Sequence, residues 1–294
     1  MNSFNKLNYW ILASRPKTLA AAIVPVMVGS ALAIKQGKFF FSYSLIALLC
    51  SILIQIGTNF TNDLFDYLKG ADTKKRKGPL RVISAGLISV KEMKLGIIIV
   101  YVLTFILGLY LVFSTDMVIL IIGILSIVAG ILYTAGPYPL AYNGLGDLFV
   151  FIFFGIIGTM GTYYLHHQEF TILSFLSSIP VGALITNILI VNNYRDIEED
   201  KLSGKKTLAV KFGKKFSRLE YIFFLSISLL IPVVFYLLFD FNYAILLPIL
   251  SIPISIKLIN MIFKYQGEEL NKTLELSAKY SALYGLLFSI GLVL

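Results

Sequence analysis

The chain has 294 residues, of which 57% are hydrophobic and 14% are charged, and its mean hydropathy is +0.84. About 25% of the residues in a soluble domain are charged, so this composition excludes an ordinary soluble protein and predicts a multi-pass protein of the lipid bilayer. The net charge of +9 is better explained by the basic residues that collect on the cytoplasmic side of a membrane than by nucleic-acid binding, so we expect no nucleic-acid partner.

Nine apolar runs follow in chain order, and each is close to the ~20 residues that a helix needs to cross a bilayer. The runs are residues 18–35, 40–66, 95–114, 117–135, 147–166, 171–193, 220–239, 242–263 and 275–294. They predict an all-α fold of nine transmembrane helices in a single domain, residues 1–294. The first run ends in Ala31-Leu32-Ala33, as a signal peptide does. Because Pro25 and Gly29 interrupt that run and more spans follow, we expect it to be retained.

The basic residues predict how the chain is oriented. Of the 25 Lys and Arg residues, all except Lys35 and Lys38 precede the first run, lie in loops, or flank the turn between the last two runs, on the same side of the membrane as the N-terminus. Basic loops remain in the cytoplasm during insertion. We therefore expect a cytoplasmic N-terminus, an external C-terminus and a multi-pass location in the plasma membrane.

Two polar clusters end apolar runs on the predicted cytoplasmic side, in loops at about 59–94 and 192–218. The first cluster contains Asn59, Asn62, Asp63 and Asp66, and the second contains Asn192, Asp196 and Asp200. In each, an asparagine precedes an aspartate by four residues, a spacing that places both side chains on one helical face. Both clusters lead into a basic loop, so the chain is predicted to contain two parallel pseudo-repeats. A further acid, Asp147, also lies at a cytoplasmic span end.

Carboxylates gathered at a membrane surface are costly unless cations lie between them. Oxygen ligands without sulfur or nitrogen favour hard ions such as Mg²⁺, which completes its shell with water and phosphate oxygens. Lys and Arg in the following loops are suited to the same phosphate oxygens. The apolar spans would accommodate a long lipid tail. These residues therefore predict a site for a lipid diphosphate with Mg²⁺.

Five segments carry a resemblance to a known family. They are "ASRPKTLAAAIVPVMVGSAL" (13–32), "NDLFDYLKGADT" (62–73), "GPLRVISAGLIS" (78–89), "GPYPLAYNGLGDL" (136–148) and "NNYRDIEEDKLSGKKTLAV" (192–210). Their order and content resemble the UbiA superfamily of membrane prenyltransferases, and within it the branch that acts on 1,4-dihydroxy-2-naphthoate. The resemblance implies nine helices around a central cavity. It also implies transfer of a polyprenyl chain from polyprenyl diphosphate to the naphthoate, with loss of carbon dioxide, in menaquinone biosynthesis.

The resemblance, together with the helical spacing for Asn59, implies roles for individual residues. The expected metal ligands are Asn59, Asn62, Asp63, Asp66, Asn192, Asp196 and Asp200, of which the four aspartates are also the expected catalytic residues. The expected diphosphate contacts are Arg15, Lys17, Arg81, Arg195 and Lys205. The expected acceptor contacts are Asn193, Tyr133, Tyr138 and Tyr142, although the tyrosines could instead be interfacial aromatics. The first motif departs from the broader superfamily pattern, because Gly70 stands where a further aspartate is frequent and the next acid is Asp72.

Three alternatives remain open. A related prenyltransferase could use another aromatic or lipid acceptor, such as 4-hydroxybenzoate. A secondary transporter would also hold ionisable residues in a membrane, but near the midplane and in inverted repeats, whereas these acids lie at span ends. A non-catalytic lipid-binding scaffold would not need two clusters suited to magnesium.

Overall fold

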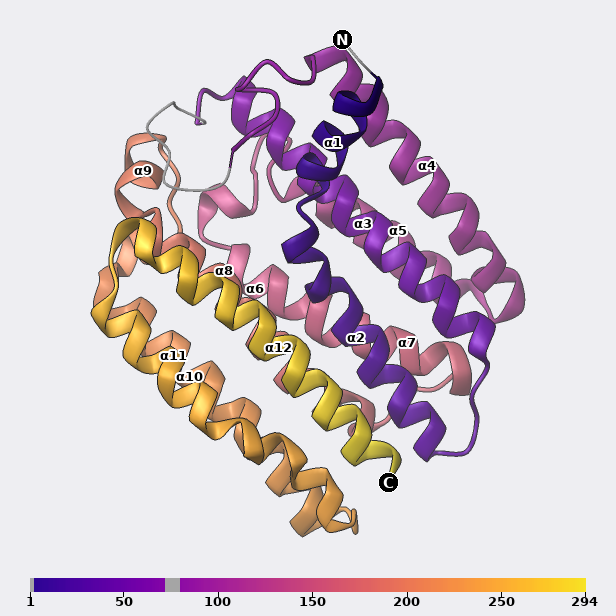
Figure 1. The fold of residues 1–294 in the computed structure, drawn as a ribbon. Helices are drawn as coiled ribbons and strands as arrows, with labels where there is room; N and C mark the ends of the chain where they lie inside the picture. The colour runs from indigo at the N-terminus through magenta and orange to yellow at the C-terminus, as the bar shows by residue number, and fades with distance from the viewer. Residues whose placement is uncertain (1–2, 72–79) are drawn as a thin grey trace.

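The computed structural model describes residues 3–71 and 80–294, apart from the side chains of residues 3–5 and Lys17. Within these ranges every regular element is helical, which confirms the all-α prediction, and the long helices run roughly alongside one another (Figure 1). The helices are α1 (Ser3–Ser14), α2 (Pro16–Lys35), α3 (Phe41–Leu68), α4 (Val90–Ser114), α5 (Met117–Leu132), α6 (Gly146–Val150), α7 (Gly158–His167), α8 (Ile172–Arg195), α9 (Ile197–Leu202), α10 (Leu208–Leu238), α11 (Ile252–Lys264) and α12 (Leu270–Val293). The shorter elements are the 3₁₀ turns η1 (Ala141–Asn143), η3 (Tyr243–Ser251) and η4 (Gly267–Glu269), and the π-helical segment η2 (Phe151–Ile157).

Eight helical spans among the described residues are long and apolar enough to cross a membrane. Each corresponds to a predicted run: α6, η2 and α7 together form the span predicted at 147–166, and η3 and α11 together form the span predicted at 242–263. The remaining predicted span is α5, which has 16 residues. Its axis is about 24 Å long, shorter than the ~30 Å hydrocarbon layer. The structure therefore supports eight full-length spans and one short apolar helix.

The structure adds two helical segments that the hydropathy of the sequence does not predict. Helix α1 precedes the first span, and its Trp10 ring packs on Phe60 of α3 with 5.2 Å between ring centroids. Helix α10 begins at Leu208, whereas the apolar run begins only at residue 220. The first part of α10 contains several lysines, so its sequence does not predict a membrane span. The helix is interrupted at Gly213, where φ is 79°.

Local capping explains where several helices begin. Ser89 and Glu92 form a reciprocal capping box at the start of α4, and Thr171 and Ser174 form a similar pair at the start of α8. The Thr207 side chain accepts a hydrogen bond from the backbone of Val210 at the start of α10. These side chains satisfy amide donors that have no partner within the first turn of a helix. The sequence thus sets the helix starts that lead out of the polar loops.

Close packing of the spans depends on small residues. Helix α8 packs against α10 and η2, α2 against α12 and α7, and α3 against α4. Where α8 meets η2, a Cβ atom at Gly155 would lie 2.6 Å from Gly182 Cα. No side chain fits there, so the two backbones touch, as is common between membrane helices. This contact holds the π-helical segment, and with it α6, against α8.

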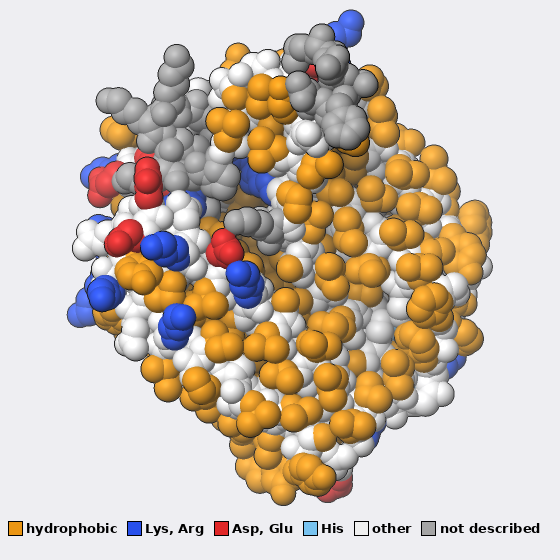
Figure 2. All heavy atoms as spheres, viewed as in Figure 1, with side chains coloured by type: hydrophobic (Ala, Val, Ile, Leu, Met, Phe, Trp, Pro, Cys, Tyr) orange, Lys and Arg blue, Asp and Glu red, His pale blue; other side chains and the backbone are white. Residues whose placement is uncertain are grey.

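Most of one face of the molecule is covered by hydrophobic side chains (Figure 2). Charged side chains on that face gather towards the end at which α8 ends and α9 lies, and the surface is hollowed beside them. This distribution is that of a membrane protein with one polar end.

Candidate active site

A cavity of about 1000 Å³ lies between the helices. Along α3 its lining residues run from Ala47 to Asp66, about 28 Å of helix axis. The Asp66 end is lined by polar and charged side chains from both predicted motifs, and the Ala47 end by apolar residues such as Leu111 and Ile119. The cavity therefore joins a charged head region to a long apolar channel.

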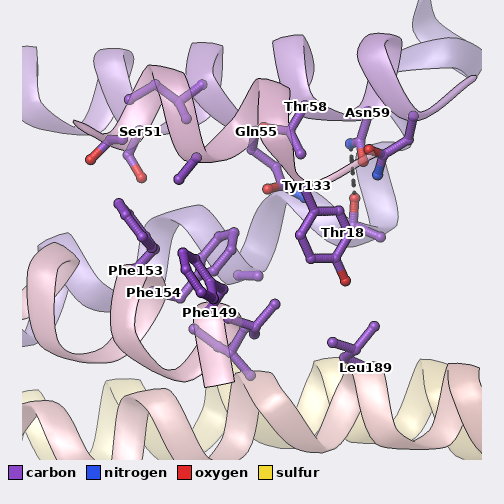
Figure 3. A pocket seen from close by; sticks show the side chains of 18 of the residues that line it. Thr18, Ser51, Gln55, Thr58, Asn59, Tyr133, Phe149, Phe153, Phe154 and Leu189 are labelled. Carbon is purple, nitrogen blue, oxygen red and sulfur yellow. Dashed lines mark hydrogen bonds between the residues drawn. The ribbon is translucent and has the colours of Figure 1, made fainter. Parts of the chain in front are cut away.

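The middle of the cavity is partly aromatic (Figure 3). Ser51, Gln55 and Thr58 of α3 lie on one side, and Phe149, Phe153 and Phe154 of α6 and η2 lie on another, with Tyr133 projecting between them. This region separates the charged end from the apolar channel.

Asp66 is the centre of the charged end and is 3% exposed. Its Oδ2 accepts a hydrogen bond from Arg81 Nη2 at 3.1 Å, and its Oδ1 accepts one from the Tyr142 hydroxyl at 2.7 Å. Lys205 Nζ lies 3.4 Å from the same Oδ1. Buried carboxylates with such partners are held in one orientation. Asp66 is therefore a fixed acceptor on the cavity wall.

Arg81 links the two aspartates of the first motif. Its Nε lies 3.7 Å from Asp63 Oδ1, and both side chains are buried. Asp66 lines the cavity together with Arg81, while Asp63 is 2% exposed beside them. The loop that carries Arg81 is thus anchored to the end of α3 by charge.

The second motif is organised by Arg195, which is 4% exposed. Its Nε and Nη2 each donate to the Asp196 carboxylate at 2.6 Å, and Nη2 also donates to Asn192 Oδ1 at 2.7 Å. Its Nη1 donates to Asn271 Oδ1 of α12 at 2.6 Å. Because the guanidinium already holds Asp196, Asn192 and Asn271, Arg195 orients the motif as well as lining the cavity.

Lys205 brings the two motifs together. Its Nζ lies 3.4 Å from Asp66 Oδ1 and 3.9 Å from Asp200 Oδ1. It also lies 4.8 Å from the centre of the Tyr142 ring, which Lys69 approaches to 4.3 Å. Residues 66 and 200, far apart in the sequence, thus share one cation at the polar end of the cavity.

The asparagines of the first motif are tied to neighbouring elements. Asn59 Nδ2 donates to the Ser14 carbonyl oxygen at 2.9 Å and to Thr18 Oγ1 at 3.2 Å (Figure 3). Asn62 Oδ1 accepts a hydrogen bond from Thr134 Oγ1 at 2.7 Å. Both side chains line the cavity. With its nitrogen engaged, Asn59 presents its amide oxygen as the atom that could ligate a cation.

A turn between helices α1 and α2 places the predicted basic residue Arg15. Arg15 lies between α1 and α2 with φ 51° and ψ 68°, a left-handed conformation that costs a non-glycine residue about 1–2 kcal/mol. This turn brings Arg15 to the wall of the cavity. The side chain of Lys17 and the whole of Asp72 lie outside the described residues, so their predicted roles stay predictions.

The predicted acceptor contacts differ in their placement. Tyr133 and Asn193 line the cavity. Burial raises the pKa of the Tyr133 phenol, and the charges of Asp147 and Asp66 raise it further, so Tyr133 stays protonated and can donate. Tyr142 has its hydroxyl committed to Asp66. Tyr138 is 61% exposed and lies on the surface.

Sequence reasoning overlooked Thr134, Lys69 and Asn271. Thr134 donates to Asn62, Asn271 accepts from Arg195, and Lys69 donates to the Thr134 carbonyl oxygen and approaches the Tyr142 ring. No local pattern marks these contacts. Asp147 was noticed as a span-end acid, but its place on the cavity wall depends on the tertiary fold.

Among the described residues, no three His, Cys, Asp or Glu side chains come together as a preformed metal site. The donors that face the charged end are nevertheless carboxylate and amide oxygens, from Asp66, Asp196, Asp200, Asn59, Asn62 and Asn192. Such donors suit Mg²⁺, which usually takes only a few protein ligands and fills its remaining positions with water and phosphate oxygens. The donor set therefore fits a metal that arrives together with a phosphorylated ligand.

The fold and the site together define a class of protein. Its members are all-helical membrane proteins with an apolar cavity that ends in paired acidic and basic side chains. The model of the UbiA prenyltransferase family matches residues 22–281. The chain belongs to that family and is a prenyltransferase.

Two relatives resemble the chain along nearly its whole length. The 1,4-dihydroxy-2-naphthoate octaprenyltransferase of Haemophilus influenzae is 39% identical, and the match covers 98% of this chain and 97% of that protein. The protein of the same name from Escherichia coli is 37% identical, with 97% and 95% covered. A solved structure of a UbiA homolog from Archaeoglobus fulgidus bound to GPP and Mg²⁺ has the same fold, with a TM-score of 0.68 at 18% identity over 97% of this chain and 99% of that one.

Proposed function

We propose that this prenyltransferase joins a polyprenyl chain from polyprenyl diphosphate to 1,4-dihydroxy-2-naphthoate. The prenyl group takes the place of the carboxylate, and carbon dioxide and diphosphate are released. The product is demethylmenaquinone in its reduced form, an intermediate of menaquinone biosynthesis. The observation that carries the proposal is the meeting of both motifs at Lys205, between Asp66 and Asp200, at the charged end of an otherwise apolar cavity.

The donor would lie along the cavity with its diphosphate at the charged end. Arg15, Lys17, Arg81, Arg195 and Lys205 are the proposed diphosphate contacts. Guanidinium and ammonium groups stabilise phosphate oxygens through charge-assisted hydrogen bonds, and their effect is strengthened where water is excluded. The prenyl tail would follow the apolar channel towards Leu111 and Ile119.

Mg²⁺ is the proposed cofactor, because the donor set at the charged end consists of oxygens. Asp63, Asp66, Asp196 and Asp200, with Asn59, Asn62 and Asn192, are the residues proposed to hold it. Bound there, Mg²⁺ would offset the negative charge that develops on the leaving diphosphate. The chain's own contribution is to fix these carboxylates, as Arg81 and Arg195 do.

Loss of diphosphate from an allylic carbon leaves positive charge on the prenyl group. Aromatic faces stabilise a cation within about 6 Å, and Phe149, Phe153 and Tyr133 line the part of the cavity next to the charged end. We propose that these rings shelter the reacting carbon and keep water away from it. Exclusion of water prevents hydrolysis in place of transfer.

The acceptor is proposed from the names of the relatives and from the polar groups that face the cavity. Tyr133 and Asn193 are the proposed contacts for the naphthoate. Tyr142 supports Asp66, and the exposed Tyr138 is left out of this part of the proposal. The basic residues of the charged end would also attract an anionic acceptor. We propose that this end faces the cytoplasm at the plasma membrane, on the strength of the Lys and Arg distribution.

The test is product formation by the purified protein in nanodiscs. Polyprenyl diphosphate and Mg²⁺ are supplied with either 1,4-dihydroxy-2-naphthoate or 4-hydroxybenzoate, with and without EDTA. Formation of the prenylated naphthol and carbon dioxide, abolished by EDTA, is the expected result. Turnover of 4-hydroxybenzoate alone would leave the donor site intact and overturn the acceptor assignment. A protein that binds the diphosphate but uses neither acceptor would favour a different acceptor.

A further inference from the structure

Asp147 differs from the other buried aspartates. Asp63, Asp66, Asp196 and Asp200 each lie within 4 Å of an Arg or Lys nitrogen. Asp147 is also buried, at 4% exposed, and lines the cavity. In the part of the chain that the structure describes, it forms no ion pair. A carboxylate held in a membrane-embedded cavity without a cation is costly and marks a functional position.

The position of Asp147 directs it towards the acceptor region rather than towards the diphosphate. It lies in the first turn of α6, directly after Gly146, and a Cβ atom at Gly146 would lie 3.2 Å from the Tyr133 hydroxyl oxygen. Among the carboxylate charges that raise the Tyr133 pKa, that of Asp147 acts most strongly. Tyr133 projects into the cavity beside Phe149 and Phe153 (Figure 3). Asp147 and Tyr133 thus both line the cavity, and the Tyr133 hydroxyl lies close to the start of α6.

Among the described residues, four other titratable groups act on Asp147 or Tyr133. Glu220 of α10 interacts electrostatically with Asp147 but is not among the residues that line the cavity. Asp66, Asp200 and Arg15 act on Tyr133 more weakly than Asp147 does. The motif aspartates have their oxygens turned to Arg81, Arg195 and Lys205, so these oxygens are already engaged by cations. Among the described residues, no ion pair engages the Asp147 carboxylate in this way.

We propose that Asp147 is the general base for the acceptor: its carboxylate takes the proton from the acceptor hydroxyl next to the ring carbon that is alkylated, while Tyr133 orients that hydroxyl. This inference rests on the proposed function and adds a catalytic residue to it. A naphtholate is a far stronger carbon nucleophile than a naphthol, so removal of this proton accelerates attack on the prenyl carbon.

The step balances without another reactant. Asp147 takes the hydroxyl proton, the ring carbon that carries the carboxylate forms a bond to the prenyl carbon, and the bond from that carbon to diphosphate breaks with its electron pair. The result is a ring ketone with a carboxylate on the adjacent carbon. The carboxylate then leaves as carbon dioxide, its bonding pair restores the aromatic ring as naphtholate, and Asp147 returns the proton to the oxygen. The base is thereby regenerated.

The test compares Asp147→Asn with the wild-type protein in nanodiscs, using geranyl diphosphate, Mg²⁺ and 1,4-dihydroxy-2-naphthoate. General-base catalysis typically contributes 10²–10⁴-fold, so we expect kcat to fall by about 10²-fold or more while geranyl diphosphate binding stays within about threefold. The rate of Asp147→Asn should rise as pH increases, because water and hydroxide deprotonate more of the acceptor. The loss should also shrink with a ring-halogenated acceptor, whose hydroxyl is more acidic.

Three further variants separate a base from a structural role. Asp147→Glu should recover much of the rate, and added formate should partly restore Asp147→Ala. Glu220→Gln, which replaces the neighbouring acid outside the cavity wall, should change kcat by less than about threefold. If Asp147→Asn does not fold, the glutamate and formate measurements still decide the matter. The proposal is overturned if kcat for Asp147→Asn is within threefold of wild type. It is also overturned if the loss of kcat does not change with pH, with the acidity of the acceptor or with added formate.

The wild-type control keeps this inference separate from the proposed function. If wild-type protein does not prenylate the naphthoate but prenylates 4-hydroxybenzoate, the acceptor assignment is wrong. The same variants are then measured with that phenol, whose hydroxyl proton also needs a base.

Discussion

The hydroxyl of Tyr142 donates a 2.7 Å hydrogen bond to Asp66, and the ammonium groups of Lys69 and Lys205 lie 4.3 Å and 4.8 Å from the centre of the Tyr142 ring. A residue of the loop after α5 thus connects the end of α3 to the loop after α9. In addition, the Lys206 backbone amide donates to the Tyr142 carbonyl oxygen at 2.8 Å. Tyr142 therefore holds both halves of the charged end in register, which is a positioning role.

Replacing Tyr142 by Phe removes the hydrogen bond and retains the ring. A hydrogen bond to a charged group contributes about 1.5–3 kcal/mol, so we expect kcat/KM for the prenyl diphosphate to fall by about 10-fold or more. Tyr138→Phe is the matched control, because Tyr138 lies nearby in the sequence and is exposed. Steady-state kinetics in nanodiscs provide the comparison. Equal behaviour of the two variants would contradict the role given to Tyr142.

Replacing Arg195 by Lys tests the organisation of the second motif. Lysine keeps the charge but cannot reach Asp196, Asn192 and Asn271 at once, because it lacks the planar fork of arginine. Each hydrogen bond to a charged group that is lost in this way contributes about 1.5–3 kcal/mol. We expect a lower midpoint of thermal unfolding together with a large loss of activity. In Arg218→Lys, where the arginine stacks on Phe263, the shift should be smaller; a shift as large as that of Arg195→Lys would rule out the special role of Arg195.

Replacing Gly123 by Phe should shorten the prenyl chain that the protein accepts. Gly123 lines the cavity, and a side chain there would enter open space. We expect turnover of a long polyprenyl diphosphate to fall at least 10-fold relative to that of geranyl diphosphate, because the ring blocks the apolar channel. Leu125→Phe is the control, since Leu125 lies on the same helix but is half-exposed outside the cavity wall. An unchanged ratio in Gly123→Phe would mean that the tail takes another path.

Mg²⁺ and the prenyl diphosphate should stabilise the protein together rather than separately. The described acids form no three-member metal site on their own, so we expect Mg²⁺ alone to shift the unfolding midpoint very little. Binding of both stabilises the folded state in proportion to their joint affinity. Thermal unfolding with Mg²⁺, geranyl diphosphate, both, and both plus EDTA measures this coupling. A full shift with Mg²⁺ alone would show that the protein holds the metal without the diphosphate.

The amino-acid sequence by itself determined the spans, the two motifs and the chemistry they suggest. A membrane span requires about 20 apolar residues in succession, and such runs are visible locally, as in α3 and α8. The pairs of asparagine and aspartate are also local, because residues four apart share a helical face. The length of α5, the helix Ser3–Ser14 and the start of α10 at Leu208 were not visible, since they depend on packing and on the break at Gly213 rather than on hydropathy.

Only the tertiary structure decided which side chains meet. The bond between Tyr142 and Asp66 and the bond between Arg195 and Asn271 each join residues from distant helices or loops. The proximity of Asp66 and Asp200 to one lysine arises in the same way. The distinct character of Asp147 also emerged only there, because the sequence shows an acid at a span end but not the absence of a basic partner. Charge pairing inside a membrane protein is set by three-dimensional distance in a poorly screening medium, and no periodicity along the chain encodes that distance.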